Sequence, residues 1–232
     1  MKFSHKVFHL DKDVERKHLC ESMNNYISQY SSELDVPTIE ISCEEHLKNF
    51  YNTSNVRFSN TGYQLNGEVG WRFGELGIWA SNIGAYKKFL ETDSDYLILM
   101  EDDIVYLPGF WDNLLHYMSQ LPNDWDAFFY YTPVTGVGVS ISGEFLTLQQ
   151  DNLDICRTYT DWSCLCYILN RNAIKKVLDD LSNPVNLPLD YYFLKQSEKY
   201  SSYTVKPSSK MYCQIANNKS TFQDKQKREI LK

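Results

Sequence analysis

The chain alternates short apolar runs with longer segments whose apolar positions have helical spacing. Residues 96–100 are continuously apolar or aromatic, which is typical of a strand buried on both faces, and residues 74–90 carry apolar side chains on one helical face. This order of elements predicts one α/β domain with a mixed, mostly parallel central sheet flanked by helices. Further strands are expected at residues 6–10, 37–41, 125–131, 163–169 and 203–206, and further helices up to about residue 30, from 108 to 121, from 173 to 181 and after 188.

Three consecutive carboxylates, Glu101, Asp102 and Asp103, follow the apolar run directly. The carboxyl ends of strands are where an open α/β sheet binds its ligands. Acids this close repel one another unless a cation lies between them, and a divalent metal that carries phosphate is the usual cation. The alternative is an acidic turn that only faces water.

Composition limits the classes of protein to consider. The length of 232 residues fits one domain, and 43% hydrophobic with 23% charged residues argues against disorder. The net charge of −7 gives no overall attraction to nucleic acid or an anionic membrane. Basic residues gather between 219 and 228, where a solvated tail is the simpler interpretation.

The sequence also predicts a cytoplasmic location, or the host cytoplasm if the protein is viral. No apolar stretch reaches the 18 residues of a membrane span, and the N-terminus lacks a secretory apolar region. The six cysteines form no C-x-x-C pair, so we interpret them as small buried side chains in a reducing compartment.

Six short motifs follow one another along the chain: residues 9–12 with Arg16, 74–77, 97–103, 166–169 with 173–178, 188–190, and 205–207 with Gln214 and Ser220. Their order resembles that of glycosyltransferase family 25, the lipooligosaccharide galactosyltransferases and their collagen-modifying relatives. One departure from the family pattern is Asn82, which stands where the family helix has a histidine and cannot titrate. The sugar and the acceptor therefore need not follow the family.

The resemblance implies a single GT-A-like domain over residues 1–232, in which residues 1–105 bind a nucleotide sugar and residues 106–232 bind the acceptor. It further implies transfer of a sugar from a nucleotide-diphosphate donor to an acceptor hydroxyl, with inversion. Mn²⁺ or Mg²⁺ would neutralise the leaving diphosphate, and oxygen ligands suit such hard ions. We expect Asp103 to bind the metal directly. Asp102 would bind it through water or contact the donor's ribose or sugar, and Glu101 would be structural.

An inverting transfer needs a base that takes the proton of the attacking hydroxyl. Asp190 matches the family's proline-x-aspartate motif and is the first candidate; its alternative role is a helix N-cap. Asp161 is the second candidate, with a turn residue as its alternative.

The opening motif suggests that Leu10 and Arg16 contact the donor, with Arg16 neutralising phosphate. Arg16 could instead form a surface ion pair of little value. Gly74 and Glu75 begin a helix whose N-terminus can face the donor, although the helix dipole alone favours an acid at Glu75. Gln214 would approach the metal or the diphosphate, with an ordinary loop hydrogen bond as its alternative.

The acceptor could be a surface or viral oligosaccharide, a glycoprotein, or a hydroxymethylated base in phage DNA. The last requires base flipping and a basic face, against which the net charge argues mildly. Two other classes remain open. One is a non-catalytic carbohydrate-binding protein, and the other is a phosphohydrolase using Asp102 and Asp103, for which we find no additional His or Asp cluster.

Overall fold

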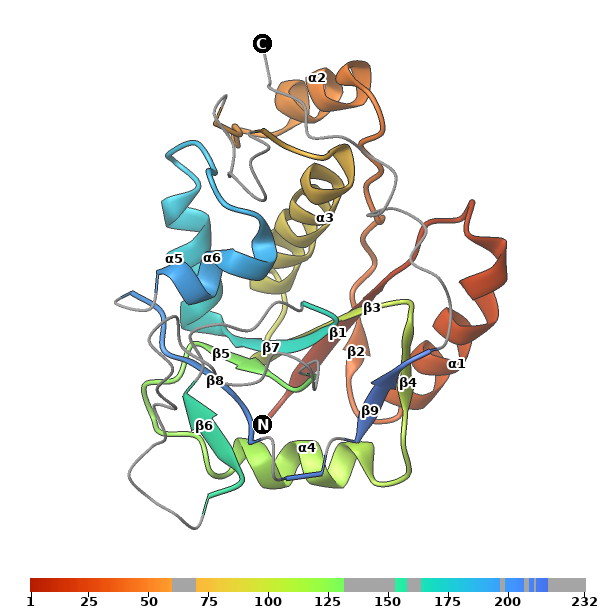
Figure 1. Cartoon of the computed structure of the whole chain (residues 1–232), viewed down its shortest axis with the longest axis vertical. Coiled ribbons are helices and arrows are strands. Elements are labelled where there is room, and N and C mark those ends of the chain that lie inside the picture. The colour runs from red at the N-terminus through yellow and green to blue at the C-terminus, as the bar shows by residue number, and fades with distance from the viewer. Residues whose placement is uncertain are drawn as a thin grey trace.

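A computed structural model describes residues 1–59, 70–131, 153–157, 164–196, 199–206, 209–210 and 212–216. Within these residues, seven strands form one sheet in the order β2–β1–β3–β7–β5–β8–β6 (Figure 1). Since only β7 and β6 run opposite to the other five strands, the predicted mixed, mostly parallel sheet in a single α/β domain is confirmed. The strands are β1 (Phe3–Phe8), β2 (Ser32–Glu33), β3 (Tyr96–Glu101), β5 (Ala127–Phe129), β6 (Ile155–Arg157), β7 (Cys166–Asn170) and β8 (Ser202–Val205).

Helices cover both faces of this sheet, so the domain has three layers (Figure 1). On one face lie α3 (Phe73–Leu90), α5 (Arg171–Asp180) and α6 (Leu189–Lys195), with α2 (Glu44–Thr53) beyond them. On the other lie α1 (Lys17–Ile27), which follows the short 3₁₀ helix η1 (Val14–Arg16), and α4 (Phe110–Met118). A separate two-stranded ribbon pairs β4 (Ile104–Tyr106) with β9 (Cys213–Ile215).

Strand β3 belongs to both halves of the core. Because side chains alternate along a strand, Leu97 and Leu99 pack under α3 while Ile98 and Met100 face the layer of α1 and α4. All four are fully buried. The prediction of a strand buried on both faces is therefore confirmed.

Strands β1 and β3 are parallel neighbours, and Phe8 pairs with Glu101 at their last positions. Their carboxyl ends consequently meet at the same edge of the sheet. The turn after β1 leads to η1 and Arg16, and the turn after β3 contains Asp102 and Asp103. Segments about 90 residues apart in sequence are thus brought together by strand pairing alone.

The expected strand at residues 37–41 is wrong, and the second strand is instead the short β2. A side chain of α3 forms a hydrogen bond with the backbone of this segment: the Ser81 hydroxyl oxygen accepts from the Ile39 nitrogen at 2.7 Å. The close approach depends on Gly77, where an added Cβ would lie 3.0 Å from the Ile39 carbonyl oxygen. The segment lies against a helix rather than a strand.

The segment between residues 43 and 70 contains α2 in its described part. All six cysteines are free, and all but Cys43 are buried. Among the described residues, no helix is both long and apolar enough to cross a membrane.

Candidate functional site

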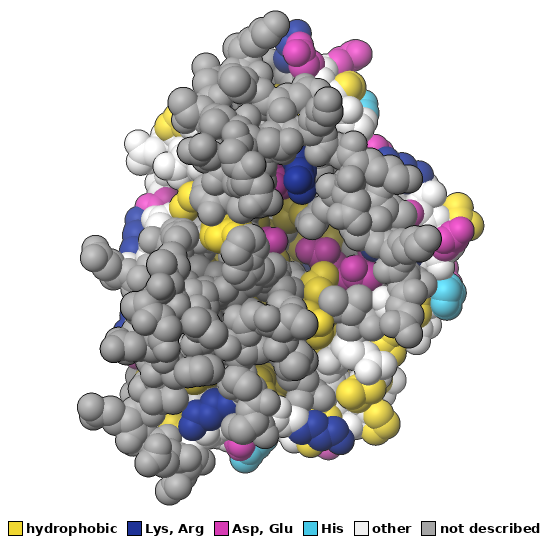
Figure 2. All heavy atoms as spheres, viewed as in Figure 1, with side chains coloured by type: hydrophobic (Ala, Val, Ile, Leu, Met, Phe, Trp, Pro, Cys, Tyr) yellow, Lys and Arg dark blue, Asp and Glu magenta, His cyan; other side chains and the backbone are white. Residues whose placement is uncertain are grey.

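A cavity of about 140 Å³ opens where β1 and β3 end, between η1, the segment 38–41 and the first turns of α3. Acidic side chains gather near the centre of the corresponding face of the molecule (Figure 2). Such an excess of acids repels a phosphate ligand unless a cation accompanies it. The charged lining residues are the acids Asp13, Glu40, Glu75, Glu101, Asp102 and Asp103 and the bases Arg16 and Arg72.

Both carboxylate oxygens of Asp102 are already engaged by the protein. Arg16 donates from Nη1 to Oδ1 at 2.9 Å, and His9 Nδ1 lies 2.7 Å from Oδ2. Burial disfavours the charged form of Arg16, but the neighbouring Asp102 and Asp103 outweigh it and leave its pKa raised. Arg16 is therefore a buried ion-pair partner rather than the surface pair considered from the sequence.

Asp103 is differently placed. Its Oδ2 lies 3.9 Å from Arg16 Nη1, and its Oδ1 is buried with no hydrogen-bond partner. Burial raises the pKa of Asp103, while Arg16 opposes the shift. A buried carboxylate oxygen without a partner is costly in the ionised state, so this position fits a divalent cation. Among the described residues, no group of three or more His, Cys, Asp or Glu could hold a metal ion by itself.

Glu101, interpreted from the sequence as structural, lines the same cavity. Burial raises its pKa well above the usual range, and Asp103, Asp190 and Asp102 add to the effect in that order. Glu101 is therefore close enough to both the strand-end acids and Asp190 to be affected by their charges. The sequence carried a signal for this residue, because an acid at the last position of a buried strand is uncommon.

Asp190 lies in the first turn of α6, whose N-cap is Pro188, so Asp190 is not the N-cap residue. Its pKa is raised to about 6, chiefly by burial and further by Glu75, while a hydrogen bond with Cys164 opposes the shift. Cys164 itself lines the cavity. The turn before α6 is held by Trp79, whose indole nitrogen donates to the Leu187 carbonyl at 2.8 Å.

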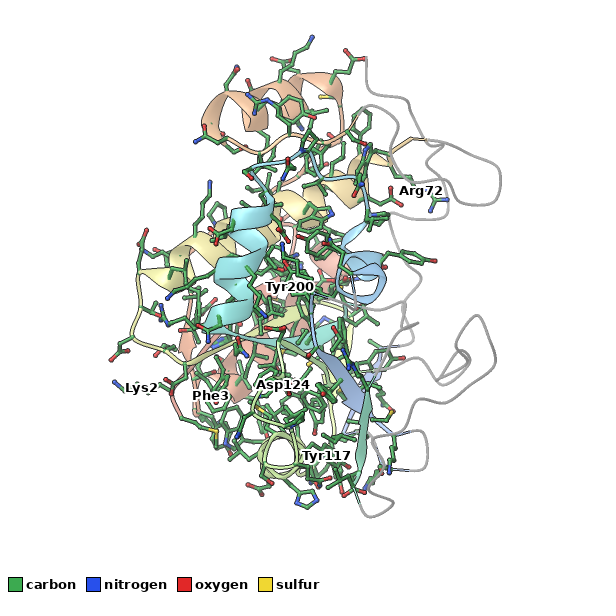
Figure 3. The ribbon with its side chains drawn as sticks, turned by 90° about the vertical axis from the view of Figure 1, so that its left-hand side faces the viewer. Lys2, Phe3, Arg72, Tyr117, Asp124 and Tyr200 are labelled. Atoms are coloured by element: carbon green, nitrogen blue, oxygen red, sulfur yellow. The ribbon has the colours of Figure 1, made fainter. Side chains whose placement is uncertain are left out.

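Arg72 was not identified from the sequence. It is the N-cap residue of α3, lines the cavity and has a buried Nε without a hydrogen-bond partner. The Glu75 carboxylate accepts from the Arg72 backbone nitrogen at 3.0 Å. Figure 3 places Arg72 on the side of the molecule that faces the viewer in Figure 2. Its position directly before the Gly74-Glu75 helix start was the available signal.

The structure brings together six of the residues selected from the sequence. Asp190 is linked to them by its charge interactions with Glu101 and Glu75 and by its hydrogen bond with Cys164. Gln214 is exposed on β9, opposite Val105, and does not line the cavity. Asp161 lies outside the described residues. The six that line the cavity are Leu10, Arg16, Gly74, Glu75, Asp102 and Asp103.

No protein-family description and no curated protein matches the chain. Three solved structures show similarity to it. The first is a glycosyltransferase involved in the glycosylation of the major capsid of PBCV-1, with 12% identity, a TM-score of 0.43, and coverage of 89% of this chain and 82% of that one. The second, A197 from STIV, has 9% identity and a TM-score of 0.44, covering 97% and 100%. The third, Drosophila β-1,4-galactosyltransferase 7 with manganese, UDP-Gal and xylobiose, has 12% identity and a TM-score of 0.36, covering 100% and 82%.

Proposed function

We propose that this chain is a metal-dependent, inverting glycosyltransferase that moves a sugar from a nucleotide-diphosphate donor to an acceptor hydroxyl. The observation that carries the proposal is the partnerless buried oxygen of Asp103 in an acid-lined cavity at the carboxyl end of a central strand. The order of sequence motifs shared with family 25 supports the same reaction.

Asp103 is the residue that would hold Mn²⁺ or Mg²⁺. Such ions keep only one or two protein carboxylates when they bind with a phosphate substrate, so one carboxylate from Asp103 would be sufficient. Asp102 is the weaker candidate because Arg16 and His9 already occupy its two oxygens. When bound, the ion supplies positive charge to the leaving diphosphate.

Arg16 and Arg72 differ in how far nearby carboxylates neutralise their charges. Arg16 is compensated by Asp102 and lies near Asp103. Arg72 lines the cavity, its Nε has no hydrogen-bond partner, and it forms no ion pair with a carboxylate of the described residues, so it is the better partner for a donor phosphate.

Asp190 acts as the base in this proposal. A carboxylate with a pKa of about 6 is ionised at neutral pH and is basic enough to accept a proton in the transition state. As the acceptor oxygen bonds to the anomeric carbon, its proton passes to Asp190. The bond from that carbon to the donor phosphate breaks, and its electron pair leaves with the diphosphate.

The test is calorimetric binding of a panel of nucleotide sugars with and without Mn²⁺, followed by an assay for release of the nucleoside diphosphate. We expect metal-dependent binding of at least one donor and its loss in Asp103→Asn. The matched control is Asp124→Asn, because Asp124 is an exposed acid remote from the cavity lining (Figure 3).

The proposal fails if no donor binds in the presence of metal, or if Asp103→Asn binds donor and metal as well as the wild type. Phosphate release from simple esters would favour a phosphohydrolase instead. Salt-sensitive binding of duplex DNA would favour a modified base as acceptor over a glycan.

A further inference from the structure

His9, Asp102 and Arg16 form one buried chain of contacts, of which Asp102 and Arg16 line the cavity. The side chains are 11%, 9% and 9% exposed, respectively. A carboxylate oxygen accepts hydrogen bonds but does not donate them, so the proton of the 2.7 Å contact belongs to His9 Nδ1. His9 Nε2 is buried and has no partner, so the ring contributes only this one bond. The backbone nitrogen of His9 is fixed separately by Thr38 Oγ1 at 3.1 Å.

The orientation of Asp102 decides which acid Arg16 pairs with. Arg16 Nη1 is 2.9 Å from Asp102 Oδ1 but 3.9 Å from Asp103 Oδ2, so a shift of about an ångström would exchange its partners. His9 holds Oδ2 of Asp102, and this leaves Oδ1 directed at Arg16. Asp103 Oδ2 stays 3.9 Å from the guanidinium, and Asp103 Oδ1 has no hydrogen-bond partner among the described residues.

We propose that His9 is a positioning residue that fixes Asp102 so that Arg16 stays off Asp103 and Asp103 remains available to a divalent ion. The inference rests on the proposed function, because the divalent ion is part of that proposal. His9 itself does not line the cavity. Without His9, Asp102 can rotate, and the guanidinium can close on Asp103 and compete with the metal.

The test compares two variants of His9. In His9→Asn the side-chain amide nitrogen takes the place of Nδ1 and can still donate to Asp102, whereas His9→Leu removes the donor and keeps an apolar side chain. Mn²⁺ affinity, measured by electron paramagnetic resonance with and without a nucleoside diphosphate, should fall about tenfold in His9→Leu, as for other residues that orient a metal ligand. His9→Asn should stay close to the wild type. Thermal unfolding of both variants fixes a temperature at which each is folded.

A double-mutant cycle with Asp102→Asn tests the route of the effect. If His9 acts through Asp102, then the losses in Mn²⁺ affinity are not additive. Additive losses, wild-type affinity in His9→Leu, or equal losses in the Leu and Asn variants would each overturn the inference.

Crystal structures of the two variants separate this inference from the proposed function. If the wild type binds no divalent ion, the metal-dependent reaction is wrong. The positioning role is then decided by Arg16 alone: its closing on Asp103 in His9→Leu but not in His9→Asn supports the role, and an unmoved Arg16 overturns it.

Discussion

The indole nitrogen of Trp79 and the carbonyl oxygen of Leu187 are joined by a 2.8 Å hydrogen bond that ties α3 to the turn before Asp190. Trp79 is fully buried, and its ring meets that of Tyr192 edge to face at 4.9 Å. Asp190 is thus placed by a residue of the helix whose first turn lines the cavity.

Replacing Trp79 with Phe removes the bond but keeps an aromatic ring. We expect a loss of about 1–3 kcal/mol in the free energy of unfolding, because the Leu187 carbonyl loses its partner, and a fall in kcat because Asp190 moves. Urea unfolding and steady-state transfer rates measure the two effects. Phe89→Leu is the control, since Phe89 is equally buried at the opposite end of α3. It should lower stability without lowering kcat, and an unchanged kcat in Trp79→Phe would contradict the role of the bond.

Local patterns were enough to predict β3, α3 and the acids after β3. An apolar run of strand length and a helical stripe are properties of neighbouring residues, and the position of Asp102 and Asp103 follows from the end of the run. The sequence could not predict that Asp102 is held by Arg16 and His9, which lie 86 and 93 residues away. Those contacts follow from the parallel pairing of β1 with β3.

The error at residues 37–41 has the same origin. These residues alternate between apolar and polar side chains as a strand does, but Ser81 of α3 hydrogen-bonds to their backbone and Gly77 lets the helix approach it closely. Tertiary contacts with α3 overrode the local preference there.

Asp190 should make the reaction slower at acidic pH, which gives an acid limb in the profile of kcat/KM against pH. A base works only when it is ionised, so kcat/KM should fall as pH decreases through about 6, the raised pKa of Asp190. Asp190→Asn should lower kcat by at least about 100-fold while donor binding persists. Steady-state rates from pH 5 to pH 8 provide the measurement.

Glu75→Gln is the matched variant for this profile. Repulsion from Glu75 contributes to the raised pKa of Asp190, so removing that charge should move the acid limb to lower pH. The amide oxygen of Gln can still accept from the Arg72 nitrogen and preserve the start of α3. A pH profile identical to that of the wild type would mean that Asp190 is not the group that titrates.

His5 should make the fold sensitive to mild acid. It is fully buried on β1, and its pKa is lowered to about 4, mainly by burial and further by Lys6, while Asn24 opposes the shift. Above pH 6.5 the ring is neutral in both folded and unfolded chains. Between pH 6.5 and about 4 the unfolded chain binds a proton that the folded chain does not, so stability falls as pH decreases, by about 3 kcal/mol in all.

Urea unfolding at pH 7.5 and pH 5 isolates this contribution when the wild type is compared with His5→Asn. The amide can replace the ring nitrogen that lies 2.9 Å from Ser31 Oγ and does not titrate. Acidic residues affect both proteins alike, so the difference between their pH dependences reports His5. Parallel dependences would refute the prediction.

Two glycines of α3 offer a matched pair for the wall of the cavity. At Gly84 an added Cβ meets nothing within 4 Å, so Gly84→Ala should raise the free energy of unfolding by about 1 kcal/mol through helix propensity. At Gly77 the Cβ would lie 3.0 Å from the Ile39 carbonyl oxygen and 3.3 Å from the Ile41 nitrogen, both of them backbone atoms. Gly77→Ala must therefore push the segment 38–41 away from α3. We expect Gly77→Ala to have a lower free energy of unfolding and weaker donor binding, measured by urea unfolding and calorimetry. Stabilisation by both substitutions would contradict this prediction, because it would show that the segment 38–41 can move without loss of stability.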